Sequence, residues 1–130
     1  MSQPKRILFI EDDVAVADMY CHELKRHNFE VDIAADGTTG LQKAMSGHYD
    51  ILLVDLMIPK PDGMEVIKTL RGSDGLGLRN SRIIILTNLA LDDKELAKMD
   101  HLIDKYLIKA NTIPSKLIEE IDELPATPAA

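Results

Sequence analysis

The segment ILLVDLMIPKPDGMEVI, residues 51–67, is the most informative part of this 130-residue chain about its fold class. Four apolar residues, 51–54, lead directly into a carboxylate, Asp55; two prolines and an Asp-Gly pair follow, and the apolar positions then resume at a helical period. Apolar residues at successive positions predict a strand that is covered on both faces, as in a parallel sheet. Because ionised carboxylates are rarely buried without partners, Asp55 indicates a site at the end of that strand.

The same alternation of short apolar runs and helix-period segments extends over most of the chain. The five runs of strand length are 7–10, 31–34, 51–54, 83–86 and 106–108. The second of them mixes polar with apolar residues and predicts an edge strand. The residues that favour helix starts after these runs are Asp13, Asp36, Asp62, Asp92 or Asp93, and Pro114. This order of elements predicts an α/β domain with right-handed crossovers.

Composition and charge narrow the class of protein. The chain is 45% hydrophobic and 28% charged, which is typical of one globular domain. The net charge of -7 argues against non-specific nucleic-acid binding and against an anionic membrane surface. Cys21 is the single cysteine and has no partner for an internal disulfide, so we expect a cytoplasmic protein. We find no signal-peptide layout and no run of about 20 apolar residues that would cross a bilayer.

Polar side chains stand at the ends of four predicted strands. In chain order they are Glu11, Asp12 and Asp13, then Asp55, then Thr87, and finally Lys109. Ligands of open parallel sheets bind beyond the carboxyl ends of the strands, so we expect these side chains to gather at one edge. Clustered carboxylates repel one another, and Mg²⁺ with oxygen ligands relieves that repulsion. A carboxylate beside such a metal can attack phosphorus, while a hydroxyl and an ammonium hold the phosphoryl oxygens.

Each of these residues also has an ordinary structural explanation. Acids are favourable at helix N-termini, a threonine can cap a helix, and a lone lysine usually lies on the surface. The acid that directly follows the buried run 51–54 is the hardest to explain in this way. The coincidence across four strand ends therefore favours a functional site.

Four motifs, RILFIEDD, VDLMIPKPDG, IIILT and YLIK, resemble in order and spacing the receiver domain of two-component response regulators. The resemblance covers about residues 5–124. It implies a flavodoxin-like three-layer fold, in which a five-stranded parallel sheet of order 2-1-3-4-5 is flanked by five helices. We therefore expect a receiver domain at residues 1–124 and a flexible tail at 125–130.

The resemblance also implies roles for the residues at the strand ends. Asp55 resembles the phosphate acceptor, and Glu11 and Asp12 resemble the pair that binds Mg²⁺, for which Mn²⁺ can substitute. The backbone carbonyl of Met57 would be a further metal ligand. Asp13 is then interpreted as the cap of the first helix.

Three further residues match family positions that bind or respond to the phosphoryl group. Thr87 and Lys109 would each bind a phosphoryl oxygen. Tyr106 resembles the aromatic switch residue that turns inward when Thr87 moves. The output surface would be the face built from the fourth and fifth strands and the helices that follow them.

In family terms the chain would be a single-domain regulator of phosphorelay signal transduction. The phosphoryl donor would be a phosphohistidine on a sensor histidine kinase or a histidine phosphotransfer protein, and the output would be contact with a downstream protein target. No direct nucleic-acid or membrane partner is implied. The domain would be no enzyme beyond catalysing its own phosphotransfer and dephosphorylation.

Three other functions share part of this pattern. A haloacid-dehalogenase-type phosphatase needs a second aspartate two residues after the nucleophile, and Met57 stands there. A flavodoxin-like electron carrier binds phosphate after its first strand, where this chain has acids. The serious alternative is an unphosphorylated receiver-like protein-interaction scaffold, although such proteins usually lack one of the acids or the lysine.

The chain departs from the family pattern beside the expected pocket. Lys109 is followed by Ala110, where the family has a proline after a cis bond, and we predict a trans bond because a cis bond to a non-proline costs about 3–4 kcal/mol. Asn88 follows Thr87, where the family prefers a small residue, and it would crowd the pocket or donate a hydrogen bond to it.

Overall fold

The computed structural model describes residues 5–72, 75, 77–78, 80 and 81–125. The strands are β1 (Arg6–Ile10), β2 (Glu30–Ala34), β3 (Ile51–Val54), β4 (Arg82–Thr87) and β5 (Lys105–Ile108). The helices are α1 (Val14–Arg26), α2 (Gly37–Ser46), α3 (Gly63–Arg71), α4 (Asp93–Met99) and α5 (Pro114–Asp122), with a short 3₁₀ helix, η1 (Lys109–Asn111), before the last.

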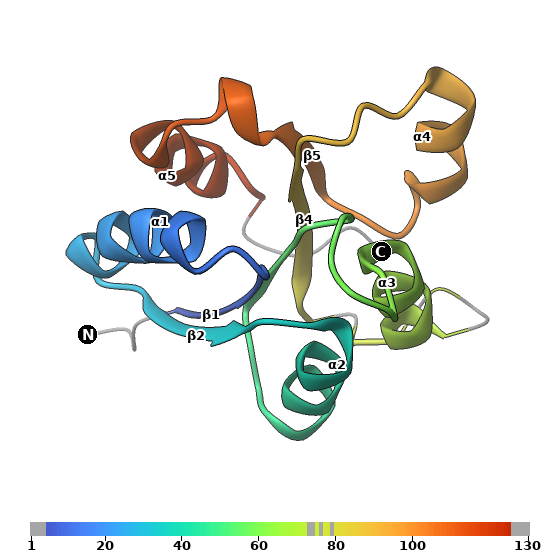
Figure 1. Cartoon of the computed structure of the whole chain (residues 1–130), viewed down its shortest axis with the longest axis horizontal. Coiled ribbons are helices and arrows are strands. Elements are labelled where there is room, and N and C mark those ends of the chain that lie inside the picture. The colour runs from blue at the N-terminus through green and yellow to red at the C-terminus, as the bar shows by residue number, and fades with distance from the viewer. Residues whose placement is uncertain (1–4, 73–74, 76, 79, 126–130) are drawn as a thin grey trace.

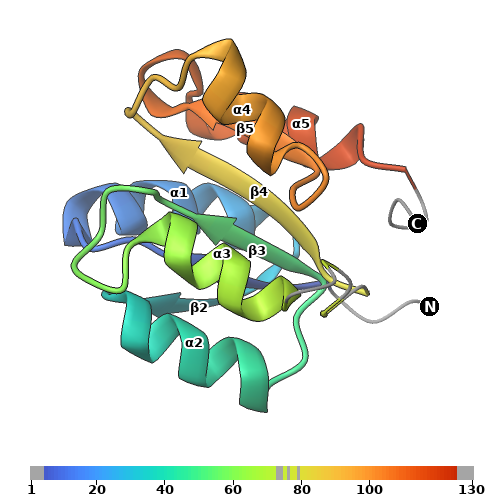
Figure 2. The ribbon, with the colours of Figure 1, turned by 90° about the vertical axis from the view of Figure 1, so that its right-hand side faces the viewer.

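The five strands form one parallel sheet of order β2-β1-β3-β4-β5, as expected, with the mixed strand β2 at an edge. Helices α1 and α5 cover one face, and α2, α3 and α4 cover the other (Figure 1). Figure 2 shows β3 and β4 pointing the same way, so the carboxyl ends of both strands lie at the same end of the sheet. This three-layer arrangement brings the polar strand ends together.

Two apolar layers hold the sheet to its helices. Successive residues of β1 alternate between them: Ile7 and Phe9 face α1 and α5, whereas Leu8 and Ile10 face α2 and α3. All four are fully buried, as the run of apolar residues predicts for a strand covered on both faces. Each such side chain contributes about 1.5–3 kcal/mol on burial. Among the described residues, no helix is both long and apolar enough to cross a bilayer.

Four helices begin at the predicted aspartates. The capping side chains, each of which accepts a backbone N–H in the first turn, are Asp13, Asp36, Asp62 and Asp92. The last helix begins at Pro114, but its cap residue Ile113 offers no side-chain bond. The Thr112 hydroxyl instead donates to the Ile108 carbonyl at 2.8 Å. Residues 126–130 of the predicted tail lie outside the part of the chain that the structure describes.

Gly63, the first residue of α3, lies against the backbone that carries Asp55. A Cβ at Gly63 would lie 2.3 Å from the Asp55 carbonyl oxygen and 2.6 Å from Leu56 Cα. These are backbone atoms that cannot move aside cheaply. The glycine therefore lets the helix approach the end of β3 closely.

We expect Gly63→Ala to lower the free energy of unfolding by about 1–3 kcal/mol, because the added methyl group forces the backbone at Asp55 to shift. Urea denaturation monitored by circular dichroism measures the change. Thr69→Ala, at an exposed position on the same helix, is the control and should change stability by less than about 0.5 kcal/mol. A Gly63→Ala protein as stable as this control would contradict the close approach.

Candidate functional site

Asp55 lies at the centre of a polar pocket at the carboxyl end of the sheet. It directly follows β3, its N–H donates to the Ile10 carbonyl at 3.1 Å, and the residue is only 3% exposed. Its Oδ1 accepts hydrogen bonds from Thr87 Oγ1 at 2.7 Å and from the Met57 N–H at 2.9 Å. Its Oδ2 accepts from Lys109 Nζ at 2.6 Å. Both carboxylate oxygens are therefore held by donors from three separate segments of the chain: the loop after β3, the end of β4 and the start of η1.

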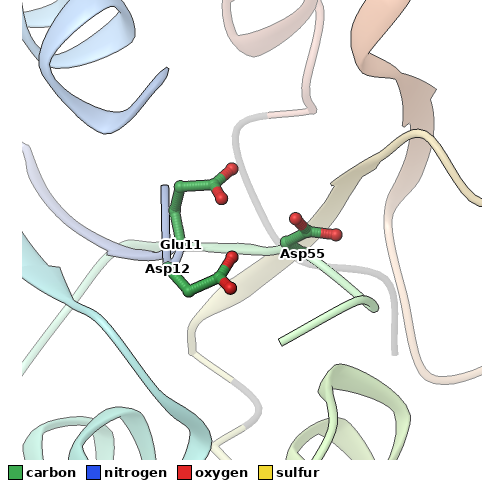
Figure 3. A group of neighbouring side chains, drawn as sticks. All are labelled: Glu11, Asp12 and Asp55. Atoms are coloured by element: carbon green, nitrogen blue, oxygen red, sulfur yellow. The ribbon is translucent and has the colours of Figure 1, made fainter. Parts of the chain in front are cut away.

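Two further carboxylates face Asp55 from the end of β1. Figure 3 shows the carboxylates of Glu11 and Asp12 pointing toward the side where Asp55 lies. One oxygen from each of the three carboxylates lies within 4.8 Å of the others. Glu11 is 1% exposed, whereas Asp12 is exposed at the mouth of the pocket. These are the three acids that the sequence predicted to meet.

The Lys109 ammonium lies between the two buried acids. Nζ is 2.5 Å from Glu11 Oε1 and 2.6 Å from Asp55 Oδ2. Both contacts are ion pairs, so the ammonium is the close partner of Glu11 Oε1 as well as of Asp55 Oδ2. The sequence indicated Lys109 as a phosphoryl partner, but its contact with Glu11 was not predicted. Only the fold shows that the lysine reaches past the ends of β4 and β3 to the residue that follows β1.

The pocket contains more acidic than basic side chains. Burial raises the pKa of Glu11, and the charge of Asp55 adds to this effect, while the ammonium of Lys109 works against it. Burial lowers the pKa of Lys109, but its contacts with Asp55 and Glu11 outweigh burial and hold that pKa above its usual value. Lys109 is thus charged at neutral pH, and three carboxylates share one ammonium. The donor set therefore fits a small divalent cation bound by oxygen atoms.

Tyr106, the predicted switch residue, contacts the loop that follows Thr87. Its hydroxyl donates to the Leu89 carbonyl and accepts from the Leu91 N–H at 3.2 Å. The Leu89 N–H in turn donates to Thr87 Oγ1 at 3.2 Å. Hydrogen bonds through Leu89 therefore connect Tyr106 to the hydroxyl that binds Asp55.

The departures from the expected pattern also meet at the pocket. Among the described residues the cis peptide bond is Lys60–Pro61, so the Lys109–Ala110 bond is trans, as predicted. Asn88 Oδ1 accepts a hydrogen bond from the Ala110 N–H at 3.0 Å. Sequence reasoning noted both residues but missed this contact. The contact depends on the register that pairs Thr87 with Ile108 and so sets the two residues in neighbouring loops, and only the structure shows that register.

The position of Met57 is consistent with its predicted place beside the acceptor. Its N–H binds Asp55, and its side chain is 59% exposed. The role of its carbonyl as a metal ligand stays a prediction. The apolar side chain of Leu89 is 38% exposed.

Comparison with known proteins adds a family to this geometry. The family model of the response regulator receiver domain matches residues 7–122. Response regulator ArlR of Staphylococcus saprophyticus is 36% identical over 104 residues, which cover 80% of this chain and 45% of that protein. This chain therefore spans about half the length of the curated relatives it matches.

Solved structures share the whole fold. A CheY-like response regulator receiver domain protein from Methanospirillum hungatei has a TM-score of 0.79 and 28% identity, with 92% of each chain covered. Response regulator TrrA from Thermotoga maritima, solved in complex with Mg²⁺ and BeF, has a TM-score of 0.77 and 28% identity. That match covers 93% of this chain and 99% of the other.

We expect Lys109→Met to lower the free energy of unfolding of the metal-free protein by about 3 kcal/mol, because it leaves two buried carboxylates facing each other without a cation. Urea denaturation in the presence of a chelator measures this loss. Adding Asp55→Asn to the variant should recover part of it. Lys94→Met, an exposed lysine on α4, is the control. Equal stability of the two lysine variants would contradict the electrostatic role of Lys109.

Proposed function

The chain belongs to the response regulator receiver family, and on this premise we propose that Asp55 accepts a phosphoryl group from a phosphohistidine donor. The observation that carries the proposal is the set of donors converging on one buried carboxylate. A hydroxyl, an ammonium and a backbone N–H all contact Asp55, and two more carboxylates lie beside it. The domain we propose comprises residues 1–124.

The proposed transfer uses the carboxylate as a nucleophile. A bond forms between an Asp55 oxygen and phosphorus while the phosphorus–nitrogen bond of the donor breaks, and the electron pair stays on the imidazole nitrogen. Thr87 and Lys109, which hold the two Asp55 oxygens in the unphosphorylated protein, would donate to the phosphoryl oxygens instead. Such donors stabilise the charge of the transferring group because they are already oriented.

The cofactor we propose is Mg²⁺, with Mn²⁺ as a substitute. Glu11, Asp12 and Asp55 would hold it, together with the Met57 carbonyl. When bound, the metal neutralises the negative charge that the acids and the phosphoryl group bring together. The support is the oxygen-only donor set, in which three carboxylates face one ammonium, and the Mg²⁺–BeF complex of the similar TrrA.

The output surface we propose is the face formed by β4, α4, β5 and α5. Drawing Thr87 toward a phosphoryl oxygen displaces the loop that Leu89 shares with Tyr106. The loop leads into α4, and Tyr106 is part of β5. Phosphorylation would thereby shift the population between two conformations of this face, which a downstream protein reads.

The roles we propose are those of a signalling domain whose catalysis is limited to its own phosphotransfer and dephosphorylation. The partners are a sensor histidine kinase or a histidine phosphotransfer protein in the cytoplasm, and a downstream protein target. The alternative function, a scaffold that binds proteins without being phosphorylated, predicts the opposite result in the next experiment.

Incubation with acetyl phosphate and Mg²⁺ should add one phosphoryl group, because this small donor reacts with an activated carboxylate without a partner protein. Intact-mass spectrometry measures the gain. Asp55→Asn should abolish it, since an amide is no nucleophile, and so should removal of Mg²⁺ with a chelator. A wild-type protein that gains no phosphoryl group would favour the scaffold.

We further expect a long-lived aspartyl phosphate, because the exposed side chains beside Asp55, Met57 and Leu89, are apolar and cannot orient an attacking water. Met57→Asn should hasten loss of the phosphoryl group about three- to tenfold by supplying a polar group next to the acceptor. Decay of the phosphorylated mass after donor removal measures the rate. Met45→Asn, a methionine that is 70% exposed on α2, is the matched control and should leave the rate unchanged.

A further inference from the structure

The loops after β4 and β5 are joined by a contact between the two residues at which this chain departs from its family. The register of the sheet pairs Thr87 with Ile108. The residues that follow them, Asn88 after β4 and Lys109 after β5, therefore leave the sheet side by side. The side chain of Asn88 then reaches one residue further, and its Oδ1 accepts the Ala110 N–H at 3.0 Å. A proline at position 110 would have no N–H for this bond.

Among the described residues, the Ala110 N–H donates to Asn88 Oδ1 and to no other acceptor. Ala110 lies in η1, and the first N–H groups of a helix have no acceptor within that helix. The cap residue of η1, Ile108, contributes no side-chain bond. Asn88 therefore caps this short helix from a loop 22 residues away in the sequence.

The helix held in this way begins with the lysine that reaches into the pocket. Lys109 contacts Asp55 and Glu11 through Nζ, while the Ala110 N–H belongs to the next peptide unit. At the end of β4, Thr87 contacts Asp55, and Asn88 is the residue directly after Thr87. The two strand ends thus close a ring that runs from Asp55 through Thr87, Asn88 and the η1 backbone to Lys109 and back to Asp55.

We propose that Asn88 is a positioning residue, which holds the start of η1 through Ala110 and so fixes Lys109 for the phosphoryl group. This inference rests on the proposed function, since it names a residue that tunes the same site. The hydrogen bond occupies the amide oxygen of Asn88 and aims it at the backbone of the neighbouring loop. Asn88 therefore acts through Lys109, and the alternative is that its NH₂ group donates directly to the phosphoryl group.

Amide hydrogen exchange of the unphosphorylated protein, measured by NMR, tests the contact itself. Asn88→Ala should speed exchange at Ala110 about five- to tenfold, the loss of one modest hydrogen bond. Asn88→Asp retains a side-chain oxygen and should keep the protection. Asn111→Ala is the matched control, because Asn111 is exposed in the same helix and its side chain makes no hydrogen bond with the described residues. Unchanged exchange in Asn88→Ala would overturn the proposal, whatever the outcome of the phosphorylation experiment.

The effect on Lys109 is tested by kinetics with acetyl phosphate. Asn88→Ala should slow phosphorylation of Asp55 about three- to tenfold, as misplacement of a charged group does, and Asn111→Ala should not. The Mg²⁺ concentration for half-maximal rate should stay unchanged, because Asn88 contacts none of the three carboxylates. Urea denaturation verifies that each variant is folded.

A second substitution separates positioning from direct donation. Ala110→Pro removes the N–H, so in that background Asn88→Ala should have no further effect on the rate. If Asn88→Ala still slowed phosphorylation in the Ala110→Pro protein, the amide group would act on the phosphoryl group itself and the positioning role would be wrong. A wild-type chain that gains no phosphoryl group would instead refute the proposed function, while hydrogen exchange would still decide the contact.

Discussion

The pocket depends on a balance between two buried carboxylates and one ammonium. Glu11 and Asp55 are almost completely removed from water, and Lys109 lies within ion-pair distance of both. Burying an ion is expensive unless a partner compensates it, and one ammonium compensates only one of the two acids. The exposed Asp12 adds a third negative charge at the mouth. The excess charge is what makes the site receptive to a divalent cation, and it also keeps Lys109 protonated.

The parallel sheet is what allows this balance to exist. Loops after β1, β3, β4 and β5 all leave the sheet at the same edge, so side chains from four separate segments meet without a long loop. The apolar layers on both faces bury the central strands β1, β3 and β4, which fixes where the last residue of each lies. Close approach of α3 at Gly63 then supports the backbone at Asp55 from the side.

The loops after β4 and β5 are connected by hydrogen bonds at two levels. Near the pocket, Asn88 binds the N–H of Ala110; farther out, Tyr106 binds the backbone of Leu89. Both connections start in the loop that follows Thr87. One ends in η1, the short helix that begins with Lys109, and the other ends in β5, the strand before it. A group that engaged the hydroxyl and the ammonium together would therefore act on one linked unit, since neither loop can move alone without breaking such a bond.

Local patterns in the sequence are enough to predict the strands, four of the helix caps and the set of polar strand ends, because these depend on periodicity and on residues next to one another. Asp55 after a run of four apolar residues and Asp13 as a helix cap are examples, and the structure confirms both positions. Which atoms meet depends on how the segments pack together. The contact of Lys109 with Glu11 and that of Asn88 with Ala110 depend on strand register and on side-chain reach across neighbouring loops, and no local pattern records those.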